Sequence, residues 1–174
     1  MRVVAGVARG RRLAAPSGRS IRPTSDRVRE AVFNALTSLG VVEGAAVVDL
    51  FAGSGAMGVE ALSRGAASVT FVDHDARALT VVRANLASTG LEPEARLVRS
   101  DVVRFLAGAP GRFDLALVDP PYRFDDDAWS AVLGTLDAEV AVLESDRAVE
   151  PGPRWDPLRV KNYGATVVTI ARQR

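Results

Sequence analysis

The sequence predicts an α/β fold: a Rossmann-like, mostly parallel twisted sheet with an antiparallel C-terminal edge, preceded by an N-terminal β-hairpin and a helix. Three observations predict it. From Ala45 onward, short apolar runs alternate with helical stretches, which is typical of repeated strand–helix units in a parallel sheet. A glycine-rich loop, "FAGSGAMG", follows the first apolar run. The final residues, 158–174, predict two strands joined at Asn162-Tyr163-Gly164, which supply the antiparallel edge.

The predicted elements follow one another without a linker. Residues 2–15 predict a hairpin with its turn at Arg9-Gly10. Thr24 or Ser25 caps a helix that runs to about Leu39. Beyond it we expect strands at 45–50, 67–73, 95–100, 113–119 and 139–145, and helices at 59–64, 76–88, 102–106 and 126–136. We therefore expect an arginine-rich hairpin extension over residues 1–23 and a single domain over residues 24–174.

Composition narrows the class of protein. The chain of 174 residues suits one domain, with 48% apolar and 25% charged residues. No apolar run approaches the ~20 residues of a membrane span, and the N-terminus lacks the apolar core of a signal peptide. The absence of cysteine excludes disulfides, a thiolate nucleophile and cysteine-ligated metals. We expect a cytoplasmic monomer, since no surplus amphipathic helix offers a dimer face.

Charge is distributed unevenly along the chain. Residues 1–29 hold eight arginines and one acid, Asp26, whereas the formal net charge of the whole chain is only +1. A basic end on an acidic body often marks a nucleic-acid contact, because arginine binds phosphate through two N–H groups. A solvated face in an arginine-rich protein is the plainer interpretation, and Lys161 is the only lysine. We favour the nucleic-acid contact.

Acidic residues collect at the predicted strand ends: Asp49, Asp73, Asp101 and Asp119. In parallel sheets, ligands bind at the carboxyl ends of the strands, near the point where the strand order reverses. Four carboxylates at successive strand ends therefore predict a binding site. Such a cluster could hold Mg²⁺ for phosphoryl chemistry. The chain lacks a phosphate-loop lysine, however, and we expect no metal.

The glycine loop raises a choice between two cofactors. Gly53-Ser54-Gly55-Ala56-Met57-Gly58 matches the G-x-G-x-x-G dinucleotide fingerprint, and Asp73 lies about twenty residues downstream. A dinucleotide would place its pyrophosphate at the following helix N-terminus, where a fixed negative charge is unfavourable. Asp49 lies four residues before Gly53. An anionic neighbour suits a cationic ligand, such as the ammonium and sulfonium groups of S-adenosylmethionine (SAM), and we therefore expect SAM.

The motif Asp119-Pro120-Pro121-Tyr122 follows an apolar strand. It resembles the D-P-P-Y signature of methyltransferases that modify exocyclic amino groups of nucleobases. Such an amine is a poor nucleophile, because its lone pair is delocalised into the ring. Asp119 and the Pro120 carbonyl can accept its two N–H groups, and the prolines offer no competing donor. Tyr122 supplies a face on which an extruded base stacks. These four residues are the predicted catalytic set.

Together these segments resemble the bacterial 16S ribosomal RNA guanine-N2 methyltransferases along nearly the whole chain. The segments "RVVAGVARGRRLAAP", "IRPTSDRVREAVFNAL", "DLFAGSGAMGVEALSRGA" and "LVDPPY" stand in that family's order, and the second is the discriminating one. The resemblance implies the class I SAM-dependent methyltransferase fold. It also implies methyl transfer to the N2 amine of one guanine, guanine 966, in 16S rRNA of the small ribosomal subunit.

The resemblance also implies site residues. In such enzymes the acid at Asp73 accepts the ribose hydroxyls and the residues around Asp101 contact adenine. The expected cofactor-binding residues are Asp49, Phe51, Ala52, Gly53, Ser54, Gly55, Gly58, Asp73, His74, Ser100, Asp101, Val102 and Asp119. For His74 we expect an exposed edge position rather than catalysis. The expected RNA contacts are Arg9, Arg11, Arg12, Arg22, Thr24, Arg27, Asn34 and Tyr122, with Glu30 in the same signature.

Three other interpretations stay open at this point. A DNA adenine-N6 or cytosine-N4 methyltransferase would use the same pocket, but such enzymes usually carry a larger recognition region. An NAD-dependent oxidoreductase would leave Asp119-Pro120-Pro121-Tyr122 without a role. A non-catalytic RNA-binding or assembly factor would not need intact Asp73 and Asp119. Residues 144–157 are rich in proline and acids and give no functional prediction.

Overall fold

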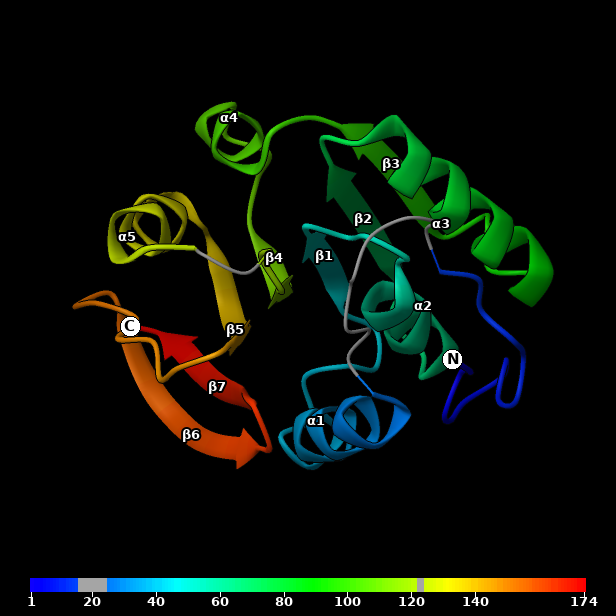
Figure 1. The fold of residues 1–174 in the computed structure, drawn as a ribbon, viewed down its shortest axis with the longest axis horizontal. Helices are drawn as coiled ribbons and strands as arrows, with labels where there is room; N and C mark the ends of the chain where they lie inside the picture. Colours follow the sequence, from blue (N-terminus) through cyan, green and yellow to red (C-terminus); the bar gives the residue numbers. More distant parts are fainter. Residues whose placement is uncertain (16–24, 122–123) are drawn as a thin grey trace.

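The computed structural model describes residues 1–15, 25–121 and 124–174; the predicted substrate residues Arg22, Thr24 and Tyr122 lie outside these ranges. A seven-stranded sheet in the order β3-β2-β1-β4-β5-β7-β6 forms its centre (Figure 1). The strands are β1 (Ala46–Leu50), β2 (Ser68–Asp73), β3 (Ala95–Arg99), β4 (Phe113–Val118), β5 (Ala138–Ser145), β6 (Trp155–Tyr163) and β7 (Thr166–Gln173). The predicted fold class is confirmed.

The strand order reverses at β1, which pairs in parallel with both β2 and β4. Leu50 at the end of β1 lies opposite Val72 on one side and Val118 on the other. The carboxyl ends of these three strands are therefore level with one another. β7 runs antiparallel to both β5 and β6, as the sequence predicted for the C-terminal edge. Ligands in such sheets bind at the carboxyl ends beside the reversal point.

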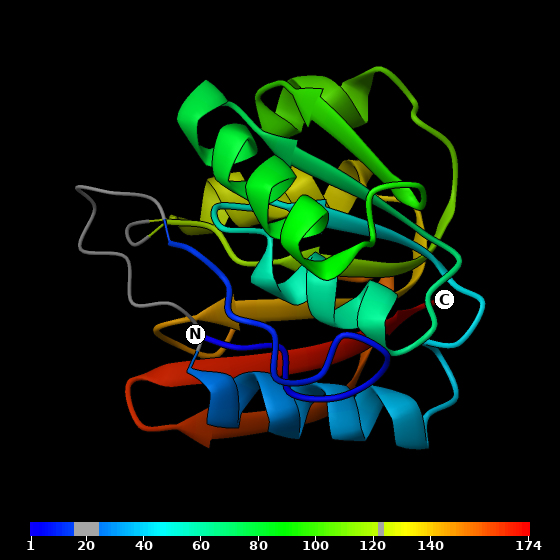
Figure 2. The same cartoon turned by 90° about the vertical axis from the view of Figure 1, so that its right-hand side faces the viewer.

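Five helices cover the two faces of the sheet in the described residues (Figure 2). One apolar layer joins α1 (Asp26–Ser38), α2 (Ala56–Ser63) and α3 (Ala76–Thr89) to the sheet, and α4 (Val102–Ala107) and α5 (Asp126–Thr135) pack in the other. Side chains of four acceptors, Ser25, Asp75, Asp101 and Asp125, cap α1, α3, α4 and α5. Of the two predicted caps for α1, Ser25 is therefore the one used.

Three local predictions are wrong in detail. α2 begins at Ala56 rather than Val59, because Gly55 adopts φ 74° and lets the chain turn at once into the helix. The C-terminal turn lies at Gly164-Ala165, since Tyr163 still pairs with Thr166. β6 begins at Trp155 rather than at the predicted residue 158. The indole of Trp155 is 2% exposed and its Nε1 donates to the Leu133 carbonyl at 3.0 Å, which fixes the strand to α5.

The predicted N-terminal hairpin is reduced to a single antiparallel bridge, Arg2 with Arg12. The two arms still exchange backbone bonds near this bridge, such as the Val3 N–H to the Arg11 carbonyl at 3.0 Å, but the next two N–H groups of the first arm bond to α2 and end the ladder. Val4 and Ala5 donate to Glu60 at 2.8 and 3.0 Å. Its apolar residues join the main core: Val3, Ala8 and Leu13 are all buried there. We call residues 1–15 the N-terminal segment.

Candidate active site

Two loops meet at the carboxyl end of the sheet. The glycine loop, residues 51–55, leaves β1, and the acidic loop, residues 119–121, leaves β4. Because Leu50 lies opposite Val118, Asp119 follows the strand at the level where Phe51 begins the glycine loop. Asp73 ends the neighbouring β2. The structure therefore brings Asp49, Asp73 and Asp119 to one edge, as the strand ends predicted.

The glycine loop has a backbone that few residues tolerate. Phe51, Gly53 and Gly55 all have positive φ, at 62°, 56° and 74°, and such a conformation in a residue other than glycine is uncommon and often marks a functional site. A Cβ on Gly53 would approach only the Phe51 carbonyl, at 3.8 Å, whereas one on Gly58 would lie 2.3 Å from the Phe71 ring. Gly58 therefore permits close packing of α2 on the sheet, and Gly53 leaves an open face above the loop.

Asp49 lies beneath the loop and is 3% exposed. Its Oδ2 accepts the Gly58 N–H at 2.9 Å. The pKa of Asp49 is raised to about 8, chiefly by burial; the Gly58 hydrogen bond opposes this rise and the nearby charge of Asp73 adds to it. Without a cation beside it, this carboxyl is mostly neutral at pH 7. A cationic ligand over the loop would favour its charged form.

Asp73 supports the same loop from the next strand. Its Oδ2 accepts the Gly53 N–H at 2.9 Å and its Oδ1 accepts the Asp75 N–H at 2.8 Å. The side chain is nearly buried, yet each carboxylate oxygen has a further lone pair for a ligand hydroxyl. His74 Nδ1 lies 3.5 Å from Asp73, and its side chain is 64% exposed, which confirms its edge position.

The three predicted adenine-contacting residues follow β3 and differ in their exposure. Asp101 is exposed, and its Oδ1 caps α4 by accepting the Arg104 N–H at 3.1 Å. The Ser100 N–H donates to the Asp73 carbonyl at 3.1 Å, which holds this turn beside β2. Val102 is 3% exposed and packs in the core on the α4 and α5 side. Only the first two therefore have surfaces open to a ligand.

Aromatic contacts hold the chain beyond the acidic loop. The ring of Phe124 meets that of Phe51 edge-on at 5.3 Å between centroids, and meets Trp129 in the same way at 5.2 Å. Trp129 is buried in the core, so it is not free to stack on nucleic acid. Asp119 and Pro120 are half-buried and Pro121 is exposed. Phe124 thus ties the substrate side of the site to the glycine loop.

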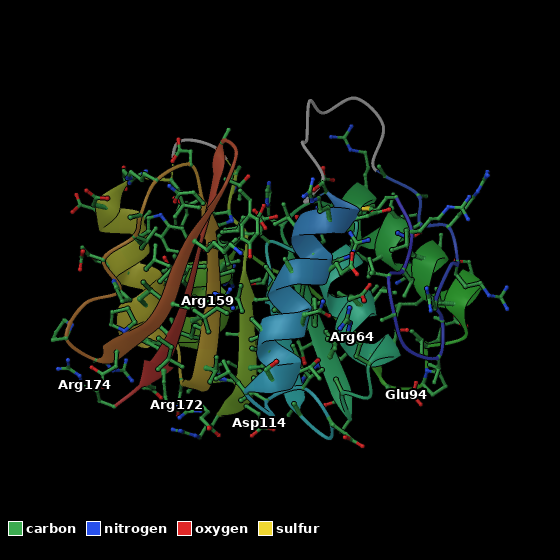
Figure 3. The ribbon with its side chains drawn as sticks, turned by 90° about the horizontal axis from the view of Figure 1, so that it is seen from below. Arg64, Glu94, Asp114, Arg159, Arg172 and Arg174 are labelled. Atoms are coloured by element: carbon green, nitrogen blue, oxygen red, sulfur yellow. The ribbon has the colours of Figure 1, made fainter. Side chains whose placement is uncertain are left out.

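The predicted RNA-contacting arginines that the structure describes, Arg9, Arg11, Arg12 and Arg27, are exposed, and the first two lie apart from the two loops. Arg9 and Arg11 follow closely after Val7 and Ala8, which bond to Ser63 at the end of α2 remote from the glycine loop. The eight-residue helix α2 therefore separates these two arginines from the glycine loop by about 12 Å along the helix axis. The amino-end edge of the sheet carries side chains of both signs, including Glu94, Asp114, Arg172 and Arg174 (Figure 3). Charge alone therefore does not identify this edge as an RNA-binding surface. Arg27 and Glu30 are exposed on the first turns of α1.

The buried face of α1 contains a charged residue. Its buried residues are Arg29, Val32, Phe33 and Leu36, whereas Val28 is half-buried and Leu39 is 40% exposed. Asn34, one of the predicted RNA contacts, is exposed, and its Oδ1 accepts from Arg64 Nη1 at 3.2 Å. The Arg29 guanidinium thus lies in the core, on the helix face that it shares with three apolar residues.

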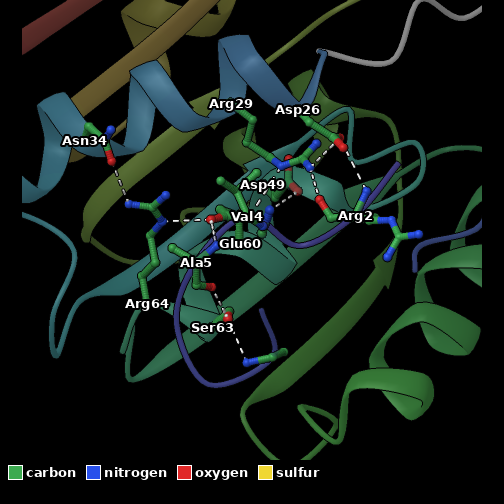
Figure 4. A network of polar contacts seen from close by, with 12 residues as sticks. Arg2, Val4, Ala5, Asp26, Arg29, Asn34, Asp49, Glu60, Ser63 and Arg64 are labelled. Atoms are coloured by element: carbon green, nitrogen blue, oxygen red, sulfur yellow. Dashed lines mark hydrogen bonds and ion pairs between the residues drawn. The ribbon is translucent and has the colours of Figure 1, made fainter. Parts of the chain in front are cut away.

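Sequence reasoning missed a buried polar network behind the site (Figure 4). Arg29 and Glu60 are both fully buried and form an ion pair at 3.4 Å. Arg29 also donates to the Arg2 carbonyl, and Glu60 accepts from Arg64 at 2.7 Å. Two further buried polar side chains, Ser63 and Asn85, also form hydrogen bonds with the N-terminal segment. A detectable signal was present: each stands at a helical spacing where the pattern demands an apolar residue.

The arrangement fits SAM. Gly53 leaves the space over the loop open, two carboxyl groups lie beneath and beside it, and the backbone is already held in its bent form. It does not resemble a metal centre: in the described part of the chain, no three His, Asp or Glu side chains gather as possible ligands. None of the helices in these ranges has the length and apolar character to cross a membrane.

The strand order and the site together define a class I SAM-dependent methyltransferase. A dinucleotide-binding sheet continues in parallel beyond its fifth strand, whereas here the antiparallel β7 lies next to β5. The model of the family "Conserved hypothetical protein 95" matches residues 1–172, and the chain belongs to this family, the ribosomal RNA small subunit methyltransferase D family. The predicted family and cofactor are confirmed.

Named relatives agree with this assignment. The chain is 38% identical to the putative rRNA methyltransferase YlbH of Bacillus subtilis, over the full length of both. It is 40% identical to ribosomal RNA small subunit methyltransferase D of Escherichia coli K12, over 75% of this chain and 70% of that protein. The solved structure of the putative methyltransferase yhhF from E. coli superposes with a TM-score of 0.85 at 33% identity, covering 100% of this chain and 98% of that one.

Proposed function

We propose that this protein transfers the methyl group of SAM to the exocyclic N2 amine of a guanine in the 16S rRNA of the small ribosomal subunit. One observation carries the chemistry: the pairing of Leu50 with Val118 sets the acidic loop beside the glycine loop at the point where the strand order reverses. The relatives' names supply the substrate class, small-subunit ribosomal RNA. Guanine 966 is the position that the family resemblance implies.

The acidic loop holds the amine. Bound SAM supplies an electrophilic methyl group. The Asp119 carboxylate and the Pro120 carbonyl accept the two N–H groups of the base, which orients the nitrogen lone pair toward that methyl. Pro120 and Pro121 have no N–H groups to compete for these acceptors. The nitrogen becomes cationic on transfer and then loses its proton readily, so positioning rather than a strong base lowers the barrier.

The glycine loop holds the cofactor. Asp73 accepts the ribose hydroxyls through the lone pairs left free by its bonds to Gly53 and Asp75. Asp49 is buried within the low-dielectric interior beneath the loop, where its charged form attracts the sulfonium and ammonium groups. Because that charged form is costly without a cation, Asp49 favours a cationic ligand over a neutral or anionic one. This selection explains why a G-x-G-x-x-G loop serves SAM rather than a dinucleotide.

The test is methyl transfer from labelled SAM to small ribosomal subunits lacking the modification, naked 16S rRNA, duplex DNA and free nucleosides, followed by digestion and mass spectrometry. N2-methylguanosine at one site of the 16S rRNA is the expected product, and comparison of the first two substrates identifies the preferred state of the RNA. Methyladenine or methylcytosine in DNA would retain the pocket chemistry and overturn the substrate. No product from any substrate, despite bound SAM, would overturn the reaction.

A further inference from the structure

Asn85 of α3 joins two parts of the molecule that are far apart in sequence. Its side chain is 2% exposed and makes hydrogen bonds to backbone groups of both parts. Oδ1 accepts the Ala14 N–H at 2.8 Å, and Nδ2 donates to the Ala14 carbonyl at 3.0 Å. The second hydrogen of Nδ2 is directed to the Ser54 carbonyl at 2.8 Å. One planar amide therefore connects the N-terminal segment to the glycine loop.

The Ser54 carbonyl belongs to the peptide that sets the shape of the glycine loop. The N–H of the same peptide, on Gly55, donates to the Ala52 carbonyl at 2.6 Å. With both ends bonded, this peptide cannot rotate without breaking a hydrogen bond. The planar amide of Asn85 has no rotatable bond between its oxygen and its nitrogen. A displacement of Ala14 is therefore transmitted through this amide to the loop that binds the cofactor.

The N-terminal segment reaches that loop through Ala14. Its first arm is fixed to α2 by Glu60 and Ser63, whose side chains bond to Val4, Ala5 and Ala8. Ala14 precedes the stretch that leads into α1, whose first turn carries Asp26, the partner of the Arg2 N–H. The segment also carries three of the exposed arginines expected to meet RNA.

We propose that Asn85 is a positioning residue that couples RNA binding at the N-terminal segment to SAM binding at the glycine loop. This inference rests on the proposed function. RNA that holds the N-terminal segment in the arrangement seen here also holds the glycine loop in its cofactor-binding shape. Linkage makes the effect reciprocal, so a bound cofactor tightens RNA binding by the same factor. We expect a coupling factor of roughly tenfold, within the usual range of such effects.

The experiment measures the affinity for small ribosomal subunits lacking the modification, with and without saturating S-adenosylhomocysteine, which occupies the site without reacting. The ratio of the two dissociation constants is the coupling factor. Asn85→Ala removes all three hydrogen bonds and should bring the ratio close to one. Ser63→Ala is the matched control: it loosens the same segment from a buried position, but the bonds it removes join Ala5 and Ala8 rather than the glycine loop, so its ratio should stay at the wild-type value.

Thermal melting checks that each variant folds. If Asn85→Ala does not fold, Asn85→Asp replaces it, because a carboxyl group has at most one O–H and cannot donate to the Ala14 and Ser54 carbonyls together. A wild-type ratio of one, or an unchanged ratio in the Asn85 variant, overturns the coupling. Methyl transfer by the wild-type protein is measured in parallel, so that failure of the proposed function is recognised separately from failure of the coupling.

Discussion

The glycine loop and the acidic loop face each other across the β1–β4 pair, yet different forces hold them. The glycine loop is fixed by directional hydrogen bonds with buried side chains: Asp73 accepts the Gly53 N–H and Asn85 donates to the Ser54 carbonyl. Just beyond the loop, Asp49 accepts the Gly58 N–H of α2. The chain that follows the acidic loop is held by edge-on ring contacts of Phe124 with Phe51 and Trp129. Ring contacts constrain direction much less than hydrogen bonds do.

This difference matches what each loop has to bind. The cofactor loop is shaped before its ligand arrives, which lowers the entropy lost on binding. The acidic loop is rich in proline, so it has few N–H groups of its own and presents acceptors to an amine. Its arrangement is sensitive to the ring packing behind it. Variants on the acidic-loop side should therefore change turnover, and variants on the glycine-loop side should change cofactor affinity and stability.

Asp119→Ala should have the largest effect. It removes an acceptor for the amine without touching the glycine loop, so kcat should fall about 10²–10³-fold while the Kd for SAM, measured by calorimetry, stays near the wild-type value. Asp119→Asn is the matched variant: it keeps one carbonyl acceptor and should retain intermediate activity. Near-normal turnover by the alanine variant would contradict the role assigned to Asp119.

Gly58→Ala should destabilise the glycine-loop side of the site. The added Cβ would lie 2.3 Å from Phe71 and 2.9 Å from Asp49, so α2 must move away from the sheet. We expect a loss of about 3 kcal/mol in the free energy of unfolding and weaker SAM binding, measured by urea titration and calorimetry. Gly134→Ala in α5 is the control, since its Cβ meets open space and should stabilise by about 0.5–1 kcal/mol. Equal stability of the two variants would refute the packing argument.

Asp49→Asn should separate stability from binding. The pKa of Asp49 is raised from 3.8 to about 8, so between these values the folded state holds a proton that the unfolded state has lost. This bound proton contributes to the free energy of unfolding. The contribution is complete below pH 4 and is lost as the pH rises to 8, by about 1.4 kcal/mol per pH unit. The variant removes that loss, so without ligand it should melt higher than wild type at pH 8 and alike at pH 4.

The same substitution should weaken SAM binding, because the cation loses its buried counter-charge. Wild type should also release a proton on binding SAM near pH 7, seen as a buffer-dependent heat in calorimetry, and the variant should not. Parallel curves of melting temperature against pH for the two proteins would show that Asp49 does not titrate in this range.

Phe124→Leu should have a smaller effect, confined to turnover. The substitution keeps most of the apolar volume but removes two aromatic contacts, each worth about 0.5–1.5 kcal/mol. We expect kcat to fall about tenfold with little change in the affinity for SAM. Val132→Ala, in the core behind Trp129, is the comparison for general destabilisation. A loss of SAM affinity as large as the loss of turnover would show that the two loops are not separable.

Replacing Arg9, Arg11 and Arg12 together by glutamine should change the chemistry least. Turnover at saturating subunits should hold, while binding weakens and its dependence on salt flattens, by about 0.7 in the log–log slope for each phosphate that an arginine no longer neutralises. The matched charge change is Arg154, Arg172 and Arg174 at the β6–β7 edge, which should leave the slope unchanged. An equal response in both triple variants would mean that the N-terminal turn does not bind RNA.

The sequence by itself determined the sheet, the two loops and the family. Strand–helix alternation, the glycines around Ser54 and the Asp119-Pro120-Pro121 motif are local patterns, and their periodicity and turn chemistry depend on neighbours in the chain. The sequence also predicted that the two loops lie side by side, because parallel strands end at one edge of a sheet.

Tertiary structure alone decided where the polar residues of the helices go. Arg29, Glu60 and Asn85 occupy core positions, since each finds partners contributed by segments 27 to 71 residues away along the chain. Those partners convert a predicted hairpin into a segment anchored on α2 and α3. The burial of Asp49 likewise depends on α2, whose Gly58 N–H donates to its Oδ2. Burial and long-range hydrogen bonding depend on which segments meet in space, and no local pattern contains that information.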